Sequence, residues 1–395
     1  MERKTIKRTY RNQELPLFPT AVVGSLPRPV WLLDLMERYS SAYVANRREQ
    51  DLQTDWERKA QAQFHEKPIG REELNEGLDR AVEFAIGLQE TAGIDIITDG
   101  ELRRRSFTEV VCERVKGFEG NLIGGWCSAV TDKLERTGSI VADEARYLLE
   151  HTERPIKITL PSPYLMTQRH WSEGHSRKAY PTRREFLDAL IPIFRAELDE
   201  LMDMDIAIIQ FDDPGMCLLV DEKFRANYKD PDEEIRMAVE GTNAVIEDYV
   251  GRERKYGTLL ALHLCRAHRK RGIGGAGDYS SILDAIFSIQ VDQYVMEFAV
   301  PEAGGFEVFD GCEFPENRSI GVGVVDVRSI EIDDPERIVR RVEQALKYFL
   351  PEQIFLNPDC GFAPGSTNPI QMDEAYRKLR ALTEAARMLR EKYGH

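Results

Sequence analysis

The sequence has few cysteines, no long apolar run and no excess of positive charge, and each absence narrows what the protein can be. Six cysteines among 395 residues are too few for a disulfide scaffold, so we expect reduced thiols in a cytoplasmic protein. No segment approaches about eighteen uninterrupted apolar residues, which argues against a membrane span. Residues 1–11 are basic but precede no apolar core, so no secretory signal is expected. The net charge of −15 argues against nucleic acid or an anionic membrane as the main partner.

What the chain does contain is an alternation of short apolar runs with longer amphipathic runs. Eight short runs are rich in β-branched residues and nearly continuous in apolar character, as in parallel strands covered on both sides. They are residues 20–26, 94–98, 156–160, 206–211, 258–264, 293–298, 320–327 and 353–357. Helices are predicted between them, with capping signals at Thr182 and Asp334. Eight strands with helical crossovers predict a single (β/α)₈ TIM barrel over residues 1–395.

Two segments are longer than a barrel needs. Residues 29–70 follow the first predicted strand. Residues 107–155 follow the second and contain Gly117, Gly120, Gly124 and Gly125, which indicate a hairpin. Because barrel active sites lie at the carboxyl ends of the strands, both insertions are placed near the active-site face. The sequence leaves open whether they wall a site or serve as decoration or an oligomer interface.

Four potential metal ligands stand at predicted strand ends. His263 and Cys265 are two residues apart on one strand and therefore share a face. Glu297 and Cys360 end the sixth and eighth strands at a similar height. One nitrogen, one oxygen and two sulfurs form a tetrahedral set that suits Zn²⁺. The alternative is a pair of buried core cysteines beside a hydrogen-bonded histidine.

The charge of this donor set narrows the chemistry. Two thiolates and a carboxylate leave a bound Zn²⁺ with a net charge near −1, which makes it a poor acid for water. Such an ion still binds a substrate thiol and leaves its sulfur electron-rich, so the set predicts an enzyme that alkylates thiols. The other cysteines, Cys112, Cys127, Cys217 and Cys312, show no ligand spacing and are predicted to be packing residues.

Further polar groups stand at the same predicted rim. Glu101 and Asp212, after the second and fourth strands, are candidates to bind a substrate ammonium, and Ser25 is a candidate to bind a carboxylate. Together they fit an amino-acid substrate. Each of them taken singly is better explained as a helix cap or part of a rim ion pair.

The chain resembles the catalytic barrel of the cobalamin-independent methionine synthase family. The resemblance rests on residues 24–29, 98–101, 210–214, 263–265, 296–298 and 359–361, in this order along nearly the whole chain. It implies zinc on His263, Cys265, Glu297 and Cys360. It also implies that Glu101 and Asp212 bind the ammonium of homocysteine, that Ser25 binds its carboxylate, and that the product is methionine.

Two departures from the family leave the methyl donor open. The two-domain form of the family has an additional N-terminal barrel for the folate polyglutamate, and 395 residues leave no room for it. Its histidine after the seventh strand is replaced here by Arg328, which is the predicted catalytic residue at that place. The donor is therefore either a methylfolate or a methylcorrinoid, the latter free or on a corrinoid protein.

Three alternatives remain at this point. The first is zinc-dependent alkyl transfer to coenzyme M by epoxide opening, since an arginine suits a sulfonate or an alkoxide. The second is a non-catalytic zinc barrel that binds a thiol or corrinoid partner. The third is a zinc-free decarboxylase of the porphyrin type on the same barrel.

Overall fold

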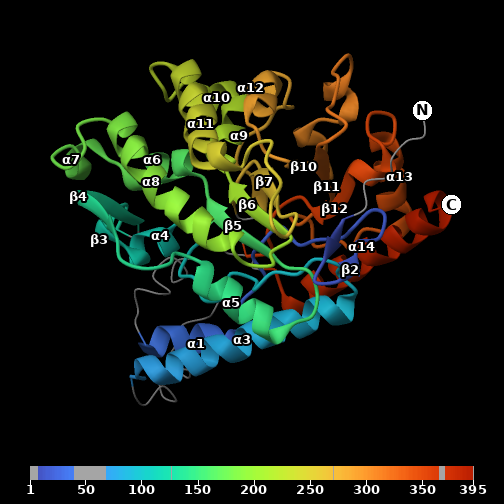
Figure 1. The fold of residues 1–395 in the computed structure, drawn as a ribbon, viewed down its shortest axis with the longest axis horizontal. Helices are drawn as coiled ribbons and strands as arrows, with labels where there is room; N and C mark the ends of the chain where they lie inside the picture. The colour runs from blue at the N-terminus through green and yellow to red at the C-terminus, as the bar shows by residue number, and fades with distance from the viewer. Residues whose placement is uncertain (1–7, 40–67, 126, 270, 364–369, 395) are drawn as a thin grey trace.

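The computed structural model describes residues 8–39, 68–125, 127–269, 271–363 and 370–394 and has a mixed α/β fold around one parallel sheet (Figure 1). Six strands pair in parallel in the order β12-β11-β10-β7-β6-β5. They are β5 (Lys157–Pro161), β6 (Ile208–Asp212), β7 (Leu259–Leu264), β10 (Gln293–Glu297), β11 (Ser319–Val325) and β12 (Ile354–Pro358). Each overlaps one of the predicted strands, so the parallel sheet is confirmed.

Helices connect the strands, as parallel pairing requires. The α-helices are α1 (Val30–Tyr39), α3 (Arg71–Ala92), α4 (Glu109–Arg114), α5 (Ala142–His151), α6 (Pro163–His170), α7 (Glu173–Ser176), α8 (Arg183–Met202), α9 (Pro214–Cys217), α10 (Glu222–Arg225), α11 (Pro231–Ile246), α12 (Leu283–Ser288), α13 (Pro335–Ala345) and α14 (Met372–Tyr393). Both predicted caps are present. The Thr182 hydroxyl accepts a hydrogen bond from the Glu185 amide at 3.2 Å, and the Asp334 carboxylate accepts one from the Glu336 amide at 3.0 Å.

The first two predicted strands are not regular strands. They contribute only isolated parallel bridges, Thr20 to Leu356, Ala21 to Ile96 and Ile97 to Ile156. Side chains form hydrogen bonds with backbone groups that would pair with a neighbouring strand in a regular sheet. The Asp95 carboxylate accepts from the Thr20 amide at 2.8 Å, and the Gln89 side chain bonds both the amide and the carbonyl of Thr98, at 2.9 and 2.7 Å.

Both insertions contain regular structure. Of residues 29–70, residues 40–67 lie outside the described part, and the described part contains α1, which packs on α3. Leu35 approaches α3 so closely that a Cβ at Gly77 would lie 2.0 Å from its methyl carbon. In residues 107–155, β3 (Val115–Ile123) and β4 (Cys127–Arg136) pair in antiparallel fashion, so the hairpin is confirmed. Two short hairpins, β1 (Thr9–Tyr10) with β2 (Gln13–Glu14) and β8 (His268–Arg269) with β9 (Gly272–Ile273), complete the strands.

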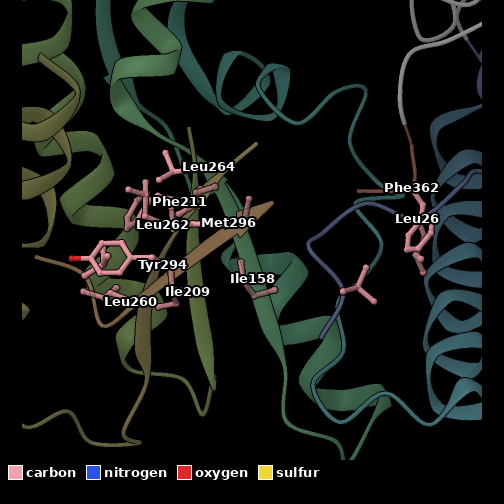
Figure 2. Packing of buried hydrophobic residues seen from close by; sticks show 14 of the residues in the cluster. Leu26, Ile158, Ile209, Phe211, Leu260, Leu262, Leu264, Tyr294, Met296 and Phe362 are labelled. Atoms are coloured by element: carbon pink, nitrogen blue, oxygen red, sulfur yellow. The ribbon is translucent and has the colours of Figure 1, made fainter. Parts of the chain in front are cut away.

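The two faces of the sheet carry different side chains. Leu260, Leu262 and Leu264 of β7 belong to the main apolar core beneath the helices, beside Phe211 and Met296 (Figure 2). The opposite face carries a second, smaller apolar cluster, which is composed of Tyr10, Ala21, Ile96, Ala207, Ile208, Ala261, Val295 and Phe355. Since alternate residues share a face, His263 and Glu297 continue this second face towards the carboxyl ends of the strands. Among the described residues, no helix combines the length and apolar character needed to cross a membrane.

Candidate metal and substrate site

Three of the predicted metal ligands meet at the carboxyl ends of two strands. His263 lies within β7, Cys265 directly follows β7, and Cys360 follows β12 by two residues. One potential ligand atom from each side chain lies within 4.8 Å of the other two. We call these three residues the strand-end cluster.

The imidazole of His263 is arranged as a ligand would be. Its Nδ1 lies 3.3 Å from the carbonyl oxygen of Val295, which can only accept, so Nδ1 carries the proton. Its buried Nε2 has no hydrogen-bond partner among the described residues. Burial, followed by the charge of Lys157, lowers the pKa of His263 to about 3, so the ring is neutral and offers a lone pair at Nε2. Histidine ligands of metal ions are typically held by such a carbonyl.

The two thiols of the cluster contact each other. Their mutual hydrogen bond, followed by burial, raises the pKa of Cys265 well above its ordinary value. Without a cation, Cys265 therefore keeps its proton at neutral pH. A cation that binds at this point displaces that proton, as metal binding to cysteine generally does. The donor chemistry, two sulfurs and one free imidazole nitrogen, fits a thiophilic ion such as Zn²⁺.

Glu297 does not belong to this group of three among the described residues, and arginines contact both of its oxygens. Arg328 Nη2 donates to Oε1 at 2.6 Å, and the backbone amide and Nη1 of Arg266 lie 3.2 and 3.4 Å from Oε2. An ionised carboxylate has about four lone-pair sites, so Glu297 retains sites for a further partner. The structure leaves its predicted part as a metal ligand untested.

Arg328 contacts a second buried carboxylate as well. Its Nη1 lies 3.5 Å from Oδ2 of Asp359, and Oδ1 of Asp359 accepts from the amides of Phe298 and Ala299, at 3.1 Å each. Burial, followed by repulsion from Glu297, raises the pKa of Asp359. Arg328 therefore links the carboxylate beside Cys360 to the carboxylate at the end of β10.

The two carboxylates predicted to bind an ammonium lie within electrostatic reach of each other. Glu101 Oε1 accepts from the Thr159 hydroxyl at 2.7 Å, and Asp212 Oδ1 accepts from the side-chain amide of Gln210 at 2.7 Å. Burial, followed by the charge of Glu101, raises the pKa of Asp212 to about 8. A pair of buried acids that repel each other in this way is stabilised by a cation, which a substrate ammonium supplies.

Glu101 is also held in an unusual backbone conformation. Its φ is 55°, in the left-handed region that few residues other than glycine adopt. Arg104 lies beneath it, with Nη1 3.6 Å from Oε1 of Glu101 and Nε 2.9 Å from Oε2 of Glu144. A Cβ at Gly24 would lie 2.5 Å from Oε1 of Glu101, so glycine at this position makes room for the carboxylate.

Ser25 lies against the loop that carries Cys360. Its hydroxyl oxygen is 3.3 Å from the amide of Ala363, and its carbonyl accepts from the amide of Phe362 at 2.8 Å. A Cβ at Gly361 would lie 2.2 Å from the Ser25 hydroxyl. The structure thus places Ser25 against the residues that directly follow Cys360.

Comparison with known proteins identifies the family. The sequence model described as "Cobalamin-independent synthase, Catalytic domain" matches residues 52–388. The chain belongs to the cobalamin-independent methionine synthase family. A methionine synthase of Pyrococcus abyssi is 29% identical to it over 386 residues, which cover 95% of this chain and 94% of that protein. A methionine synthase of Saccharolobus solfataricus is 26% identical over 387 residues, which cover 96% of each chain.

Solved structures share the fold of this family member. A B12-independent methionine synthase from Shewanella, solved with selenomethionine, has a TM-score of 0.69 at 22% identity and covers 95% of this chain and 98% of its own. A methyltransferase from Methanosarcina mazei has a TM-score of 0.50 at 12% identity, with 96% of each chain covered. At these identities the likeness is one of fold.

Several charged residues of the site went unnoticed in the sequence. Arg266 and Asp359 are buried beside the cluster, and Lys157 is buried beneath the acidic pair. Arg266 and Asp359 directly adjoin Cys265 and Cys360, so adjacency to a predicted ligand was a usable signal. Lys157 gave no such signal, because its importance comes from burial.

Proposed function

We propose that the chain is a zinc-dependent methyltransferase that transfers a methyl group to the thiol of homocysteine and forms methionine. The observation that carries the proposal is the strand-end cluster, in which an imidazole and two thiols from distant parts of the chain lie together. Membership of the methionine synthase family supports the homocysteine substrate. In this proposal His263, Cys265 and Cys360 would hold the zinc, and Glu297 would be the fourth protein ligand, which gives way to the substrate sulfur.

The zinc would supply one thing: it would lower the pKa of the substrate thiol while leaving its sulfur electron-rich. The residues of the chain do the rest. Arg266 and Arg328 offset the negative charge of two thiolates and Glu297. The apolar cluster behind His263 excludes water from one side, which strengthens every electrostatic interaction at the site.

The acidic pair and Ser25 orient the amino acid. Glu101 and Asp212 bind its ammonium group, and the Ser25 hydroxyl binds its carboxylate. Arg104 keeps Glu101 in place from below, and Lys157 contributes positive charge near Asp212. Two fixed ends of the substrate leave its sulfur in one position for in-line attack on the methyl carbon, and such orientation supplies much of the rate.

Arg328 is proposed to act by positioning. It stands at the place of the family histidine, but its guanidinium holds Glu297 and Asp359. Because its charge is already matched by two carboxylates, no observation favours a sulfonate at this position, and the coenzyme M reaction gains no support. The methyl donor is proposed to be a small methylated cofactor, a methylfolate or a methylcorrinoid.

The same proposal includes the form of the domain. The bridges from Thr20 to Leu356, Ala21 to Ile96 and Ile97 to Ile156 continue the strand order from β12 back to β5. We propose that they close the sheet into a single (β/α)₈ barrel spanning residues 1–395. The insertions at 29–70 and 107–155 would then lie near its active-site face.

The test is product formation by purified, zinc-loaded protein. Homocysteine is supplied with methylcobalamin or with 5-methyltetrahydrofolate, and methionine is measured by mass spectrometry. We expect methionine with one of the donors, its loss in Cys360→Ser, and its retention in the matched control Cys312→Ser, an exposed cysteine outside the site. Absence of methionine with both donors contradicts the proposal, and epoxide-dependent alkylation of coenzyme M would replace it with the alternative.

A further inference from the structure

A second group of cysteine, histidine and glutamate side chains lies outside the site described above. Glu109 and Cys112 are on α4, Cys127 is the first residue of β4, and His170 is the last residue of α6. We call these four residues the hairpin cluster. They come from three secondary-structure elements, and their spacing along the sequence is not one that predicts a metal site.

Three of the four residues lie at the separations that a bound ion requires, and the fourth, Cys127, lies beside the same histidine nitrogen. Single potential ligand atoms of Glu109, Cys112 and His170 lie within 4.8 Å of one another. The sulfurs of Cys112 and Cys127 are each 3.4 Å from Nδ1 of His170, and Oε1 of Glu109 is 3.8 Å from the same nitrogen. In a tetrahedral zinc site, the bonds are about 2.3 Å to sulfur and about 2.1 Å to nitrogen, so a sulfur ligand and a nitrogen ligand lie about 3.6 Å apart.

Burial makes the group unusual for a packing cluster. The side chains of His170 and Glu109 are 0% and 2% exposed, and Cys127 is buried beside them. Nε2 of His170 has no hydrogen-bond partner among the described residues. An imidazole with one unpartnered nitrogen next to a buried carboxylate and two thiols is costly to bury, unless a cation binds there.

The ring can present Nδ1 to an ion. Nδ1 lies 2.9 Å from the carbonyl oxygen of Ser128 and donates to it. Transfer of that proton to the unpartnered Nε2 gives the other neutral tautomer and frees the Nδ1 lone pair. The imidazole remains uncharged in both forms.

The carboxylate is already supported as a metal-bound carboxylate would be. The amide and the hydroxyl of Ser128 donate to Oε1 and Oε2 of Glu109, at 2.8 and 2.6 Å, and Arg105 forms an ion pair with Oε2. Hydrogen bonds of this kind orient metal ligands in proteins. The arginine also offsets the net charge near −1 that two thiolates and a carboxylate leave on a divalent ion.

We propose that Glu109, Cys112, Cys127 and His170 bind a second zinc ion that fixes the β3–β4 hairpin and α4 to α6. Four protein ligands complete a tetrahedral shell, so the ion is structural and has no position for substrate. Arg105 directly follows the segment that carries Glu101 and Arg104. The ion therefore stabilises the loop on which the proposed ammonium site stands, and this second site does not depend on the proposed reaction.

The test counts zinc ions in a variant that leaves the hairpin cluster intact. Wild-type protein and Cys265→Ser/Cys360→Ser are loaded with zinc, passed through a desalting column and analysed by mass spectrometry for metal per chain. We expect two ions in the wild type and one in the double variant. Zero in the double variant overturns the proposal. Because the readout is metal content, a failure of the methyl-transfer proposal does not affect it.

A second arm assigns the remaining ion. Two proteins are loaded with Co²⁺, and their thiolate-to-cobalt absorption is measured. The first carries Cys265→Ser/Cys360→Ser, and the second carries these two substitutions together with Cys112→Ser/Cys127→Ser. The band is expected in the first protein and absent in the second, whereas the control Cys312→Ser keeps it. If thiol titration instead finds Cys112 and Cys127 oxidised in a protein that binds no metal, the pair is a disulfide and the metal site is wrong.

Discussion

The strand-end cluster and the hairpin cluster each contain one histidine and two cysteines, but the glutamate near each of them is placed differently. Oε1 and Oε2 of Glu297 are held by two arginines, and Glu297 is not part of the group formed by His263, Cys265 and Cys360. Glu109 is held chiefly by Ser128 and lies within the group formed by Cys112 and His170. In our proposals Glu297 would give way to the substrate sulfur at the first cluster, whereas Glu109 would remain bound at the second.

The comparison teaches that donor type alone does not distinguish a catalytic metal site from a structural one. Catalytic zinc sites keep an open position, and structural sites have four protein ligands. The surroundings of the two clusters also fit a substrate site in the first case and a structural site in the second. The strand-end cluster lies near the buried acidic pair, whereas the hairpin cluster connects secondary-structure elements.

The largest expected difference between the clusters is in turnover. Stabilisation of the substrate sulfur supplies several kcal/mol to the transition state, so Cys360→Ser should lower kcat/KM on the order of 10³-fold. Cys112→Ser/Cys127→Ser leaves the reacting atoms untouched and should cost less than about tenfold. Steady-state methylation of homocysteine measures both. An equal loss in the two variants would mean that the hairpin cluster takes part in the chemistry.

The next difference concerns how the two carboxylates are held. Arg328 is the partner of two buried carboxylates, so Arg328→Met should lower the free energy of unfolding by about 3 kcal/mol. Glu109 keeps both hydrogen bonds from Ser128 without its arginine, so Arg105→Met should cost about 1 kcal/mol. Urea unfolding of the two variants gives the values. Similar costs would show that arginine is equally important at both carboxylates.

A smaller effect is expected at the acidic pair beside the strand-end cluster. Loss of a charged hydrogen bond to the substrate ammonium costs about 1.5–3 kcal/mol, so Asp212→Asn should raise the Kd for homocysteine about 10- to 100-fold. The control ligand is 4-mercaptobutanoate, which has no ammonium group and should bind both proteins alike. Isothermal titration calorimetry of both ligands with both proteins measures these Kd values. If both ligands weaken equally, Asp212 does not bind the ammonium.

The smallest expected effect is a dependence of amino-acid binding on pH. Asp212, with its pKa raised to about 8, is largely protonated at pH 7, and the ammonium prefers its ionised form. Affinity should therefore increase with pH, by about fivefold from pH 7 to pH 8 for one such group. Methionine is the suitable probe because it has no thiol. The increase should be absent in Asp212→Asn, and an affinity that falls over this interval would contradict the assignment.

Much of the parallel sheet followed from the sequence, because buried parallel strands are continuous apolar runs. The runs at 20–26 and 94–98 look the same in sequence, yet they form only bridges. The side chains of Asp95 and Gln89 bond their backbones, and no periodicity reveals that competition.

The two clusters show the same limit. His263 and Cys265 were found because residues two apart on a strand share a face. Cys112 and Cys127 were predicted to be packing residues because they show no ligand spacing in the sequence. They lie beside His170 only when a helix, a hairpin and another helix have folded together. Arg328 was predicted from its place after the seventh strand. Arg266 was missed although it adjoins Cys265, because adjacency draws attention to a residue but does not show which way its side chain points.

The central claim is that the strand-end cluster holds a zinc ion that binds the substrate sulfur. Selenium-edge X-ray absorption of selenohomocysteine bound to the zinc-loaded protein tests it directly, because the spectrum reports only the atoms close to selenium. We predict a zinc neighbour of selenium in the wild type and in Cys112→Ser/Cys127→Ser, and none in Cys360→Ser. Selenium with only carbon neighbours in the zinc-loaded wild type would contradict the account.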